Sequence, residues 1–334
     1  MNILVTGGLG FIGANFIHFW MEKHPQDNVI NVDSCTYAAV EANQRPVENR
    51  PTYFFEKADI ADFCAMDAIV KKYSVDVIVN FAAESHNSNA VLQPTVFYQT
   101  NVMGTQNLLE VVRQNPAVRR LHHVSTCEIY GDMALESETP FTEESSLGGN
   151  SPYSSSKAGG NLAVFAYCKT FGVPVTVSSC VNNYGYYQFP EKLLPVFITS
   201  LIQGKPLTLY AESNFKREWL HVRDHCEAIA AILEWGEPGQ AYNIGSGVEK
   251  SIEEIADLLL EYFGRPQTDK CYVPSRPSHD RRYWLSSEKI KAQLGWEPKI
   301  AFEAGLADTV EWYIQNELWW KPLLERRIAQ ENKW

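Results

Sequence analysis

The sequence predicts an α/β protein built on a doubly wound parallel sheet of the Rossmann type, with a smaller α/β lobe that binds the substrate. Three observations support this prediction. A glycine-rich segment joins the first apolar strand to a helix, strands and helices then alternate along the first half of the chain, and the apolar strands end in polar residues. Alternation of this kind indicates βαβ units, whose ligands collect at the carboxyl ends of the strands.

The first βα unit carries the glycine-rich segment. A short apolar strand is predicted at Asn2–Thr6, and TGGLGFIG follows it directly. Apolar residues recur at helical spacing from Phe11 onward, so the helix begins inside the glycine run. The run fits both G-x-G-x-x-G and G-x-x-G-x-x-G, each ending at Gly13. Glycines allow a tight turn and a close approach to a pyrophosphate, which then lies on the N–H groups of the helix start.

The second strand, predicted at Val29–Val32, ends at Asp33. A carboxylate about 20 residues after the last glycine accepts hydrogen bonds from the ribose hydroxyls of a dinucleotide. Ser34 adds no positive charge beside it, so NAD is favoured over NADP as the cofactor. Taken alone, Asp33 is also compatible with a turn residue or a helix cap.

The alternation continues to residue 180. Strands are predicted at Tyr53–Phe55, Val75–Phe81, Leu121–Ser125 and Val175–Ser179, and helices end at Tyr73, span about 94–114 and span Tyr153–Phe171. We therefore expect residues 1–180 plus 218–245 to form the NAD-binding domain. The nucleotide-sugar-binding lobe then consists of residues 181–217 plus 246–334. The tail after Ser286 is predicted to form two helices, with Trp319 and Trp320 as packing or interface residues.

Bulk properties exclude several classes of function. The chain has 334 residues and a formal net charge of −11, which argues against binding along a nucleic-acid backbone. No segment approaches the ~20 apolar residues needed to cross a membrane, and the start MNILVTGGLG does not resemble a secretory signal. The seven cysteines lack C-x-x-C pairs or metal-type clustering, so we expect reduced thiols, a cytoplasmic protein and no bound metal.

Three residues form a candidate acid–base group. SPYSSSKAGGN places Tyr153 and Lys157 four residues apart at a helix start, so that both side chains lie on one face. A lysine ammonium beside a phenol favours the phenolate, and this is expected to lower the pKa of Tyr153. Thr126 in VSTCEIYG lies at a strand end and provides a hydroxyl for the same proton path. Ser/Thr, Tyr and Lys in this order are more specific than a Tyr-x-x-x-Lys pair, which also occurs on solvated helix faces.

Over nearly its whole length the chain resembles the extended short-chain dehydrogenases, and in particular the dTDP-glucose 4,6-dehydratases. The resemblance rests on segments that include TGGLGFIG, FAAESH, VSTCEIYGD, SPYSSSKA, NNYGYYQFPEKLLP and RPSHDRRY. It implies an NAD-dependent dehydratase of a nucleoside-diphosphate hexose. Tyr153, with Thr126 and Lys157, takes the proton of the sugar 4-OH while hydride leaves C4. Glu128 corresponds to the base that removes the C5 proton, water leaves from C6, and hydride returns to C6.

Cys127 departs from the pattern of that family, which has Asp there as the acid that protonates the departing hydroxyl. A thiol is a far poorer acid. Glu128 then serves as both base and acid, or Cys127 donates the proton slowly. Alternatively hydride returns to C4 and leaves a 5,6-ene sugar, or the substrate is a uronic acid that decarboxylates. A 4-epimerase, which needs no C5 base, is disfavoured, and so is an inactive NAD-binding regulator.

The strand ends and the resemblance together imply the binding residues. Expected cofactor contacts, besides Tyr153 and Lys157, are Gly7, Gly10, Phe11, Ile12, Gly13, Asp33, Ser34, Thr36, Asp59, Ile60, Ala82, Ala83, Thr100, Cys180 and Asn182. Expected substrate contacts are Ser85, His86, Asn87, Asn182, Glu191, Lys192, Leu193, Thr208, Tyr210, Arg217, Arg276 and His279. Tyr210 is expected to stack on a pyrimidine.

Further expectations concern the sugar end of the site, the nucleotide base, two arginines and the oligomeric state. The family usually reads HVDRS where this chain has His86-Asn87-Ser88-Asn89-Ala90, so the sugar end of the site is expected to differ. Thr208 replaces the usual proline of the base-binding stretch, so thymidine and uridine both remain open as the base. Arg281 and Arg282 are equally compatible with phosphate binding and with salt bridges.

The helices around 94–114 and 153–171 pair across a two-fold axis in relatives, which implies a homodimer.

Overall fold

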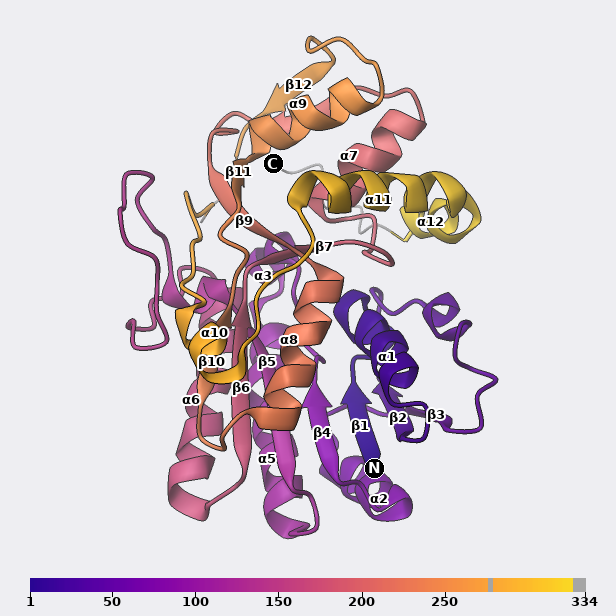
Figure 1. The fold of residues 1–334 in the computed structure, drawn as a ribbon, viewed down its shortest axis with the longest axis vertical. Helices are drawn as coiled ribbons and strands as arrows, with labels where there is room; N and C mark the ends of the chain where they lie inside the picture. The colour runs from indigo at the N-terminus through magenta and orange to yellow at the C-terminus, as the bar shows by residue number, and fades with distance from the viewer. Residues whose placement is uncertain (276–278, 327–334) are drawn as a thin grey trace.

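The computed structural model describes residues 1–275 and 279–326, and its central feature is a seven-stranded sheet (Figure 1). The strand order is β3-β2-β1-β4-β5-β6-β10 and every neighbouring pair is parallel. This is the Rossmann order extended by one strand. The strands are β1 (Asn2–Thr6), β2 (Asn28–Asp33), β3 (Tyr53–Lys57), β4 (Val77–Asn80), β5 (Arg120–Thr126), β6 (Val175–Cys180) and β10 (Ala241–Ile244).

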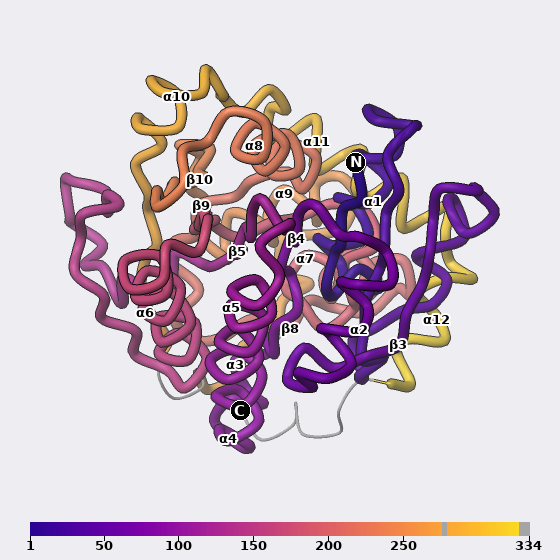
Figure 2. Tube along the Cα trace, turned by 90° about the horizontal axis from the view of Figure 1, so that it is seen from below, coloured from indigo at the N-terminus to yellow at the C-terminus, as the bar shows by residue number. Residues whose placement is uncertain are grey.

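Helices cover both faces of this sheet, as the view in Figure 2 shows. On one side α1 (Phe11–Lys23) packs against α8 (Val222–Trp235). On the other lie α2 (Phe63–Tyr73), α5 (Thr105–Gln114) and α6 (Pro152–Phe171), preceded by the short helices α3 (Asn87–Leu92) and α4 (Pro94–Tyr98). The central strands β1 and β4 are mostly apolar because both faces are buried, whereas β5 and β6 also bury polar side chains such as His122 and Ser178. The predicted doubly wound sheet is confirmed.

The smaller lobe lies beyond the carboxyl ends of the strands (Figure 1). It contains a three-stranded sheet of β11 (Glu249–Ser251), β9 (Lys216–His221) and β7 (Asn182–Tyr184), and a pair formed by β12 (Lys270–Val273) and β8 (Leu207–Tyr210). The helices α7 (Leu193–Ile202), α9 (Ile252–Tyr262), α11 (Phe302–Gln315) and α12 (Glu317–Leu324) share one apolar core with these strands. In the described ranges, no helix combines the length and apolarity that a bilayer crossing needs.

The stretch predicted to be helical near 94–114 is helical throughout, but it contains a π-helical turn at Gln99–Gly104, which hydrophobic spacing does not reveal. The prediction of two helices for the tail is wrong. The tail forms three helices within the described residues. Helix α10 (Glu288–Leu294) precedes α11, and Asn316 separates α11 from α12. Trp320 is fully buried and donates from its indole to the carbonyl of Tyr313, which agrees with a packing role.

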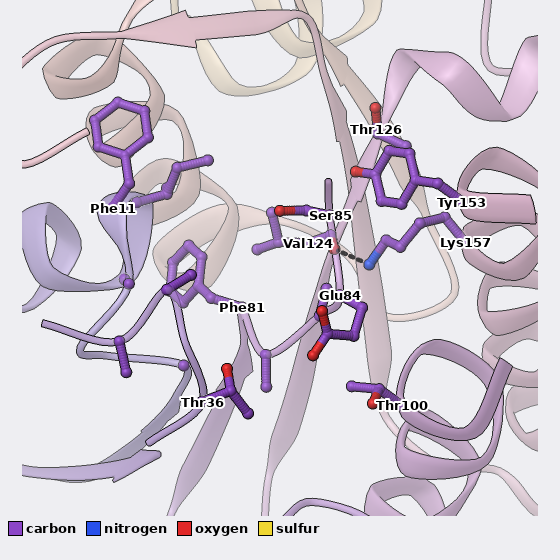
Figure 3. A pocket seen from close by; sticks show the side chains of 18 of the residues that line it. Phe11, Thr36, Phe81, Glu84, Ser85, Thr100, Val124, Thr126, Tyr153 and Lys157 are labelled. Atoms are coloured by element: carbon purple, nitrogen blue, oxygen red, sulfur yellow. Dashed lines mark hydrogen bonds between the residues drawn. The ribbon is translucent and has the colours of Figure 1, made fainter. Parts of the chain in front are cut away.

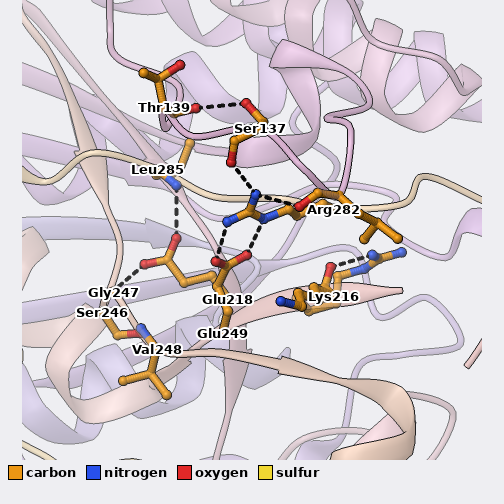
Figure 4. Close-up of polar contacts among 12 residues, drawn as sticks. Ser137, Thr139, Lys216, Glu218, Ser246, Gly247, Val248, Glu249, Arg282 and Leu285 are labelled. Carbon is orange, nitrogen blue, oxygen red and sulfur yellow. Dashed lines mark hydrogen bonds and ion pairs between the residues drawn. The ribbon is translucent and has the colours of Figure 1, made fainter. Parts of the chain in front are cut away.

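A buried carboxylate joins three distant segments of the chain (Figure 4). Glu218 in β9 is fully buried, and its two oxygens accept hydrogen bonds from the backbone N–H groups of Gly247 (2.6 Å) and Leu285 (2.9 Å). Burial raises the pKa of this carboxyl to about 7. Beside it, Arg282 makes a bidentate ion pair with Glu249 and donates to two carbonyls of the loop after β5.

We expect Glu218→Gln to lower the free energy of unfolding by about 1–3 kcal/mol. The glutamine NH₂ must face one of the two backbone N–H donors, and a buried donor is then left without an acceptor. Urea unfolding near pH 5 measures the effect, because at higher pH ionisation of the buried carboxyl costs the wild type stability and would mask it. Glu261→Gln makes the same chemical change at an exposed position and serves as the control. Equal stability of the two variants would contradict the assignment.

Candidate active site

A cavity of about 750 Å³ opens at the carboxyl ends of the parallel strands and is closed on its far side by the segment that leads into α7. Strand ends of β1, β2, β4, β5 and β6 contribute to its walls, together with the start of α6. Figure 3 shows Thr126, Tyr153 and Lys157 on one side of the cavity and Phe11 and Thr36 on the other.

The glycine-rich turn is built for close backbone approach. Gly7 has φ +70°, and a Cβ there would lie 2.8 Å from the Ala82 nitrogen. A Cβ on Gly13 would lie 2.3 Å from the Gly7 carbonyl oxygen, so α1 can begin this close to the turn only with glycine. The backbone therefore lines the cavity without side chains at the point where a pyrophosphate meets a helix start.

Asp33 lies at the end of β2 and is 8% exposed. Its two oxygens accept hydrogen bonds from the backbone N–H groups of Leu9 (3.0 Å) and Cys35 (2.8 Å). Burial raises the pKa of this carboxyl, and the two N–H groups oppose that shift. Because each carboxylate oxygen can accept more than one bond, Asp33 is held in place and remains able to accept from ribose hydroxyls.

Every predicted cofactor contact lies on the wall of this cavity. From the glycine turn to the far strands these are Gly7, Gly10, Phe11, Ile12, Gly13, Asp33, Ser34, Thr36, Asp59, Ile60, Ala82, Ala83, Thr100, Tyr153, Lys157, Cys180 and Asn182. Thr100 reaches the cavity from the π-helical turn, a feature that is frequent at functional sites. The cofactor contacts themselves stay predictions.

The acid–base residues come from β5 and α6. The Thr126 hydroxyl lies on the same side of the cavity as the Tyr153 phenol (Figure 3) and acts to lower the pKa of Tyr153. The ammonium of Lys157 donates to the Val124 carbonyl oxygen over 2.8 Å. Ser151 caps α6 through a reciprocal pair of hydrogen bonds with Ser154, which fixes where Tyr153 enters the cavity.

The expected lowering of the Tyr153 pKa is not what the structure shows. Burial raises the pKa of Tyr153 well above its ordinary value, and Glu128 and Cys180 act in the same direction. Burial also lowers the pKa of Lys157 to about 8. The cause is desolvation, which disfavours both charged forms in this closed site.

Glu128 and Cys127 lie in a 3₁₀ turn, Cys127–Tyr130, directly after β5. The Thr126 hydroxyl accepts from the Glu128 backbone N–H over 3.3 Å and fixes the start of this turn. The Glu128 carboxylate accepts hydrogen bonds from the Asn87 amide nitrogen. The neighbouring Cys127 is buried, with 2% of its surface exposed. Burial, reinforced by Glu128, raises the pKa of the Cys127 thiol well above its ordinary value.

Five of the predicted substrate contacts also line the cavity: Ser85, Asn87, Asn182, Glu191 and Lys192. Lys192 donates to the Ser85 carbonyl oxygen over 2.9 Å, so the segment before α7 is tied to the end of β4. Glu191 is buried and accepts from the Tyr37 hydroxyl over 3.1 Å.

Six further predicted substrate contacts that the structure describes lie outside the wall of this cavity. His86 caps α3 and Leu193 opens α7, whereas Thr208 is exposed on β8. The rings of Tyr210 and His279 pack edge to face, 5.2 Å apart. Arg217 is buried and donates to the backbone carbonyls of Lys216, Asp280 and Arg281. Arg276 lies outside the described residues.

Sequence reasoning missed several residues of the wall. Glu84, directly after the predicted Ala82-Ala83 strand end, lines the cavity, and burial raises the pKa of its carboxyl. Its place at a strand end is a signal that was available. Gln99, Gln188 and Phe189 carry no such signal. For Arg281 and Arg282 the structure shows ion pairs with Asp132 and Glu249.

A Rossmann sheet, a glycine turn followed by an acidic β2 end, and Thr126, Tyr153 and Lys157 at one cavity define an extended short-chain dehydrogenase/reductase. The profile of the family described as GDP-mannose 4,6 dehydratase matches residues 4–309. This chain belongs to that family.

Its relatives match over nearly the full length of both chains. A dTDP-glucose 4,6-dehydratase from Haemophilus influenzae is 44% identical over 335 residues, which cover 95% of this chain and 98% of that protein. The structure of a dTDP-glucose 4,6-dehydratase from Bacillus anthracis in complex with NAD has TM-score 0.91 and 45% identity, covering 97% of this chain and 99% of the other. One from Streptomyces venezuelae with NAD bound has TM-score 0.93 and 43% identity, covering 97% and 100%.

Proposed function

We propose that this chain is an NAD-dependent dTDP-glucose 4,6-dehydratase that converts a nucleoside-diphosphate hexose to its 4-keto-6-deoxy product. The observation that carries the proposal is the convergence of Thr126, Glu128, Tyr153 and Lys157 on one cavity that also holds the glycine turn. The dTDP-glucose 4,6-dehydratases described above match nearly the whole chain at 43–45% sequence identity, and two of them were solved with NAD.

The residues present fit NAD. The Cβ-free cradle formed by Gly7 and Gly13 suits the pyrophosphate, and the buried Asp33 carboxylate suits the ribose hydroxyls. When bound, NAD supplies a hydride acceptor for sugar C4 and later a hydride donor for C6.

The protein's own groups handle the protons. Tyr153 takes the proton of the 4-hydroxyl, with the Thr126 hydroxyl on the same side of the cavity (Figure 3) and Lys157 held in place by the Val124 carbonyl. Because burial disfavours the phenolate, this transfer is best coupled to loss of hydride from C4, so that no free phenolate accumulates. The 4-ketone acidifies the C5 proton, and Glu128 takes it.

Elimination then requires a proton for the departing 6-hydroxyl. Cys127 is a poor source, because burial raises the pKa of its thiol. Glu128 carries a proton after the preceding step and is the carboxyl next to Cys127 in the same turn. We therefore propose that it returns its proton to the 6-hydroxyl. The C5 and C6 bonds then break on the same face of the sugar, where one carboxyl reaches both.

Cys127→Ala is therefore expected to retain kcat within about threefold, because the thiol contributes neither charge nor an acidic proton. Steady-state turnover of dTDP-glucose measures this. Cys127→Asp is the companion variant, since it introduces a carboxylic acid at the same place. A loss of kcat beyond about 30-fold in Cys127→Ala alone would make the thiol the proton donor.

Incubation with dTDP-glucose and UDP-glucose, each deuterated at C4, tests the function. Deuterium on a C6 methyl group, detected by NMR, supports the 4,6-dehydratase. The substrate in which it appears identifies the nucleotide base. Label that stays at C4 beside a new alkene indicates a 5,6-dehydratase, and loss of carbon dioxide from a uronic-acid analogue indicates a decarboxylase. Complete inertness with bound NAD would support the inactive regulator.

We also propose that the protein is a cytoplasmic homodimer. Each subunit consists of the two lobes predicted above, 1–180 plus 218–245 and 181–217 plus 246–334. Large apolar side chains are exposed on neighbouring helices: Tyr98 and Met103 near α4, and Leu162 and Phe171 on α6. A second copy would cover them, which sedimentation equilibrium tests. All seven cysteines are free thiols, as a reducing compartment would maintain.

A further inference from the structure

Asn87 lies between the two elements that carry the acid–base chemistry. It is the first residue of α3, after the end of β4, and its side chain lines the cavity. Its amide nitrogen is 3.2 Å and 3.4 Å from the two oxygens of Glu128. Its amide oxygen accepts from the Ser151 hydroxyl over 3.4 Å. Ser151 is the N-cap of α6, two residues before Tyr153.

Donor and acceptor chemistry fixes which way the Asn87 amide points. An ionised carboxylate only accepts hydrogen bonds, so the group that faces Glu128 must be the NH₂. The amide oxygen then faces Ser151. The oxygen of that hydroxyl accepts from the Ser154 backbone N–H over 3.1 Å, and its hydrogen has two acceptors in reach, the Asn87 oxygen at 3.4 Å and the Ser154 hydroxyl at 3.0 Å. The contact with Glu128 thus determines which way the amide points.

We propose that Asn87 is a positioning residue that holds the Glu128 carboxylate in line with the C5–H bond. Glu128 follows β5 and Tyr153 opens α6, so their relative placement depends on contacts between separate elements. Asn87 supplies one such contact from Glu128 to the N-cap of α6. The two groups act on adjacent sugar carbons, C5 and C4, and the bridge keeps them in register.

The contact distances suit this role. They lie at the long end of the hydrogen-bond range, and such bonds often shorten only when the substrate complex forms. Both carboxylate oxygens are within reach of one NH₂, which limits rotation of the carboxylate plane. The bond persists when Glu128 carries a proton, since its carbonyl oxygen still accepts. Asn87 can therefore guide both proton removal from C5 and proton delivery to the 6-hydroxyl, as the proposed function requires.

Asn87→Leu tests the role, because leucine keeps the branching at Cγ without polar atoms. We expect kcat for dTDP-glucose to fall by about 10- to 100-fold, the size of effect that a misplacement near 1 Å produces. KM should change less than about threefold. Formation of reduced nicotinamide in a single turnover should keep its rate, and the kinetic isotope effect with C5-deuterated substrate should increase, because C5–H cleavage becomes rate-limiting.

Two further variants make the test specific. Asn87→Asp places a second carboxylate beside Glu128, and the acid limb of the pH profile of kcat should move to higher pH, since neighbouring carboxylates retain a proton. Ser88→Ala changes the next residue of α3, which does not line the cavity, and should behave as the wild type. Thermal unfolding of all three variants checks that the fold is retained.

A wild-type kcat and isotope effect in Asn87→Leu would overturn the proposal. So would parallel loss of C4 oxidation, which would mean that Asn87 holds the substrate and does not act through Glu128. If the wild-type protein itself never forms reduced nicotinamide with dTDP-glucose, the proposed function has failed, and this result is distinct from either outcome for Asn87.

Discussion

Glu128→Gln is expected to oxidise the sugar at C4 and then stop. The glutamine amide has no basicity with which to take the C5 proton, so kcat should fall by about 10²- to 10⁴-fold, the usual contribution of a positioned general base. Tyr153, Thr126 and Lys157 are unchanged, and the first hydride transfer should proceed. Reduced nicotinamide should then accumulate on the protein, visible by its absorbance after mixing with dTDP-glucose.

The same variant provides its own control, because C4 oxidation and overall turnover are measured in one sample. A second check is exchange of the C5 hydrogen with deuterated water, which should disappear together with turnover. If Glu128→Gln turns over within about tenfold of the wild-type rate, a different group removes the C5 proton. Glu84, a half-buried carboxyl that also follows a strand end in the cavity wall, would be the next residue to replace.

Tyr153→Phe is expected to block the reaction one step earlier. Without the phenol oxygen there is no acceptor in place for the proton of the 4-hydroxyl, so formation of reduced nicotinamide and overall turnover should both fall by about 10²- to 10⁴-fold. The ring is packed edge to face against Phe97, 6.4 Å between centroids, so phenylalanine fills the same space. Stopped-flow absorbance measures the first step.

Tyr167→Phe removes a hydroxyl from the same helix. That hydroxyl accepts from Gln106, away from the cavity, and the variant should retain activity. Retained C4 oxidation in Tyr153→Phe would assign the base role to another group. These two substitutions thus separate the steps: Tyr153→Phe loses both signals, whereas Glu128→Gln keeps the first.

The Rossmann half was predictable because its signals are local. The glycine turn, the apolar strands and the acidic end of β2 occur within short stretches, and the predicted elements from β1 to β6 match the structure to within a few residues. The π-helical turn at Gln99–Gly104 was not predictable, because it changes the hydrogen-bond spacing and leaves the apolar pattern intact. The small sheets of the second lobe pair short segments far apart in the chain, for which sequence offers no register.

The site follows the same division. Residues at strand ends, such as Asp33 and Thr126, were identified because topology places them together. Contacts between separate segments were not, and Asn87 and Glu128, 41 positions apart, are the clearest example. The direction of the Tyr153 pKa was also missed, because sequence reveals a lysine neighbour and does not reveal how completely the pair is buried.

The hydrogen bond from the Leu285 backbone N–H to Glu218 has a consequence for how the protein folds during synthesis. During synthesis, β9 leaves the ribosome well before the segment that contains Leu285 and Arg282. Until then the Glu218 carboxylate lacks one of its two backbone donors and Glu249 lacks its guanidinium partner. Strand β10, the edge of the large sheet, is likewise covered by α10, which arrives later still. Nascent chains that end before about residue 295 should therefore be protease-sensitive even though all seven strands of the large sheet have been synthesised.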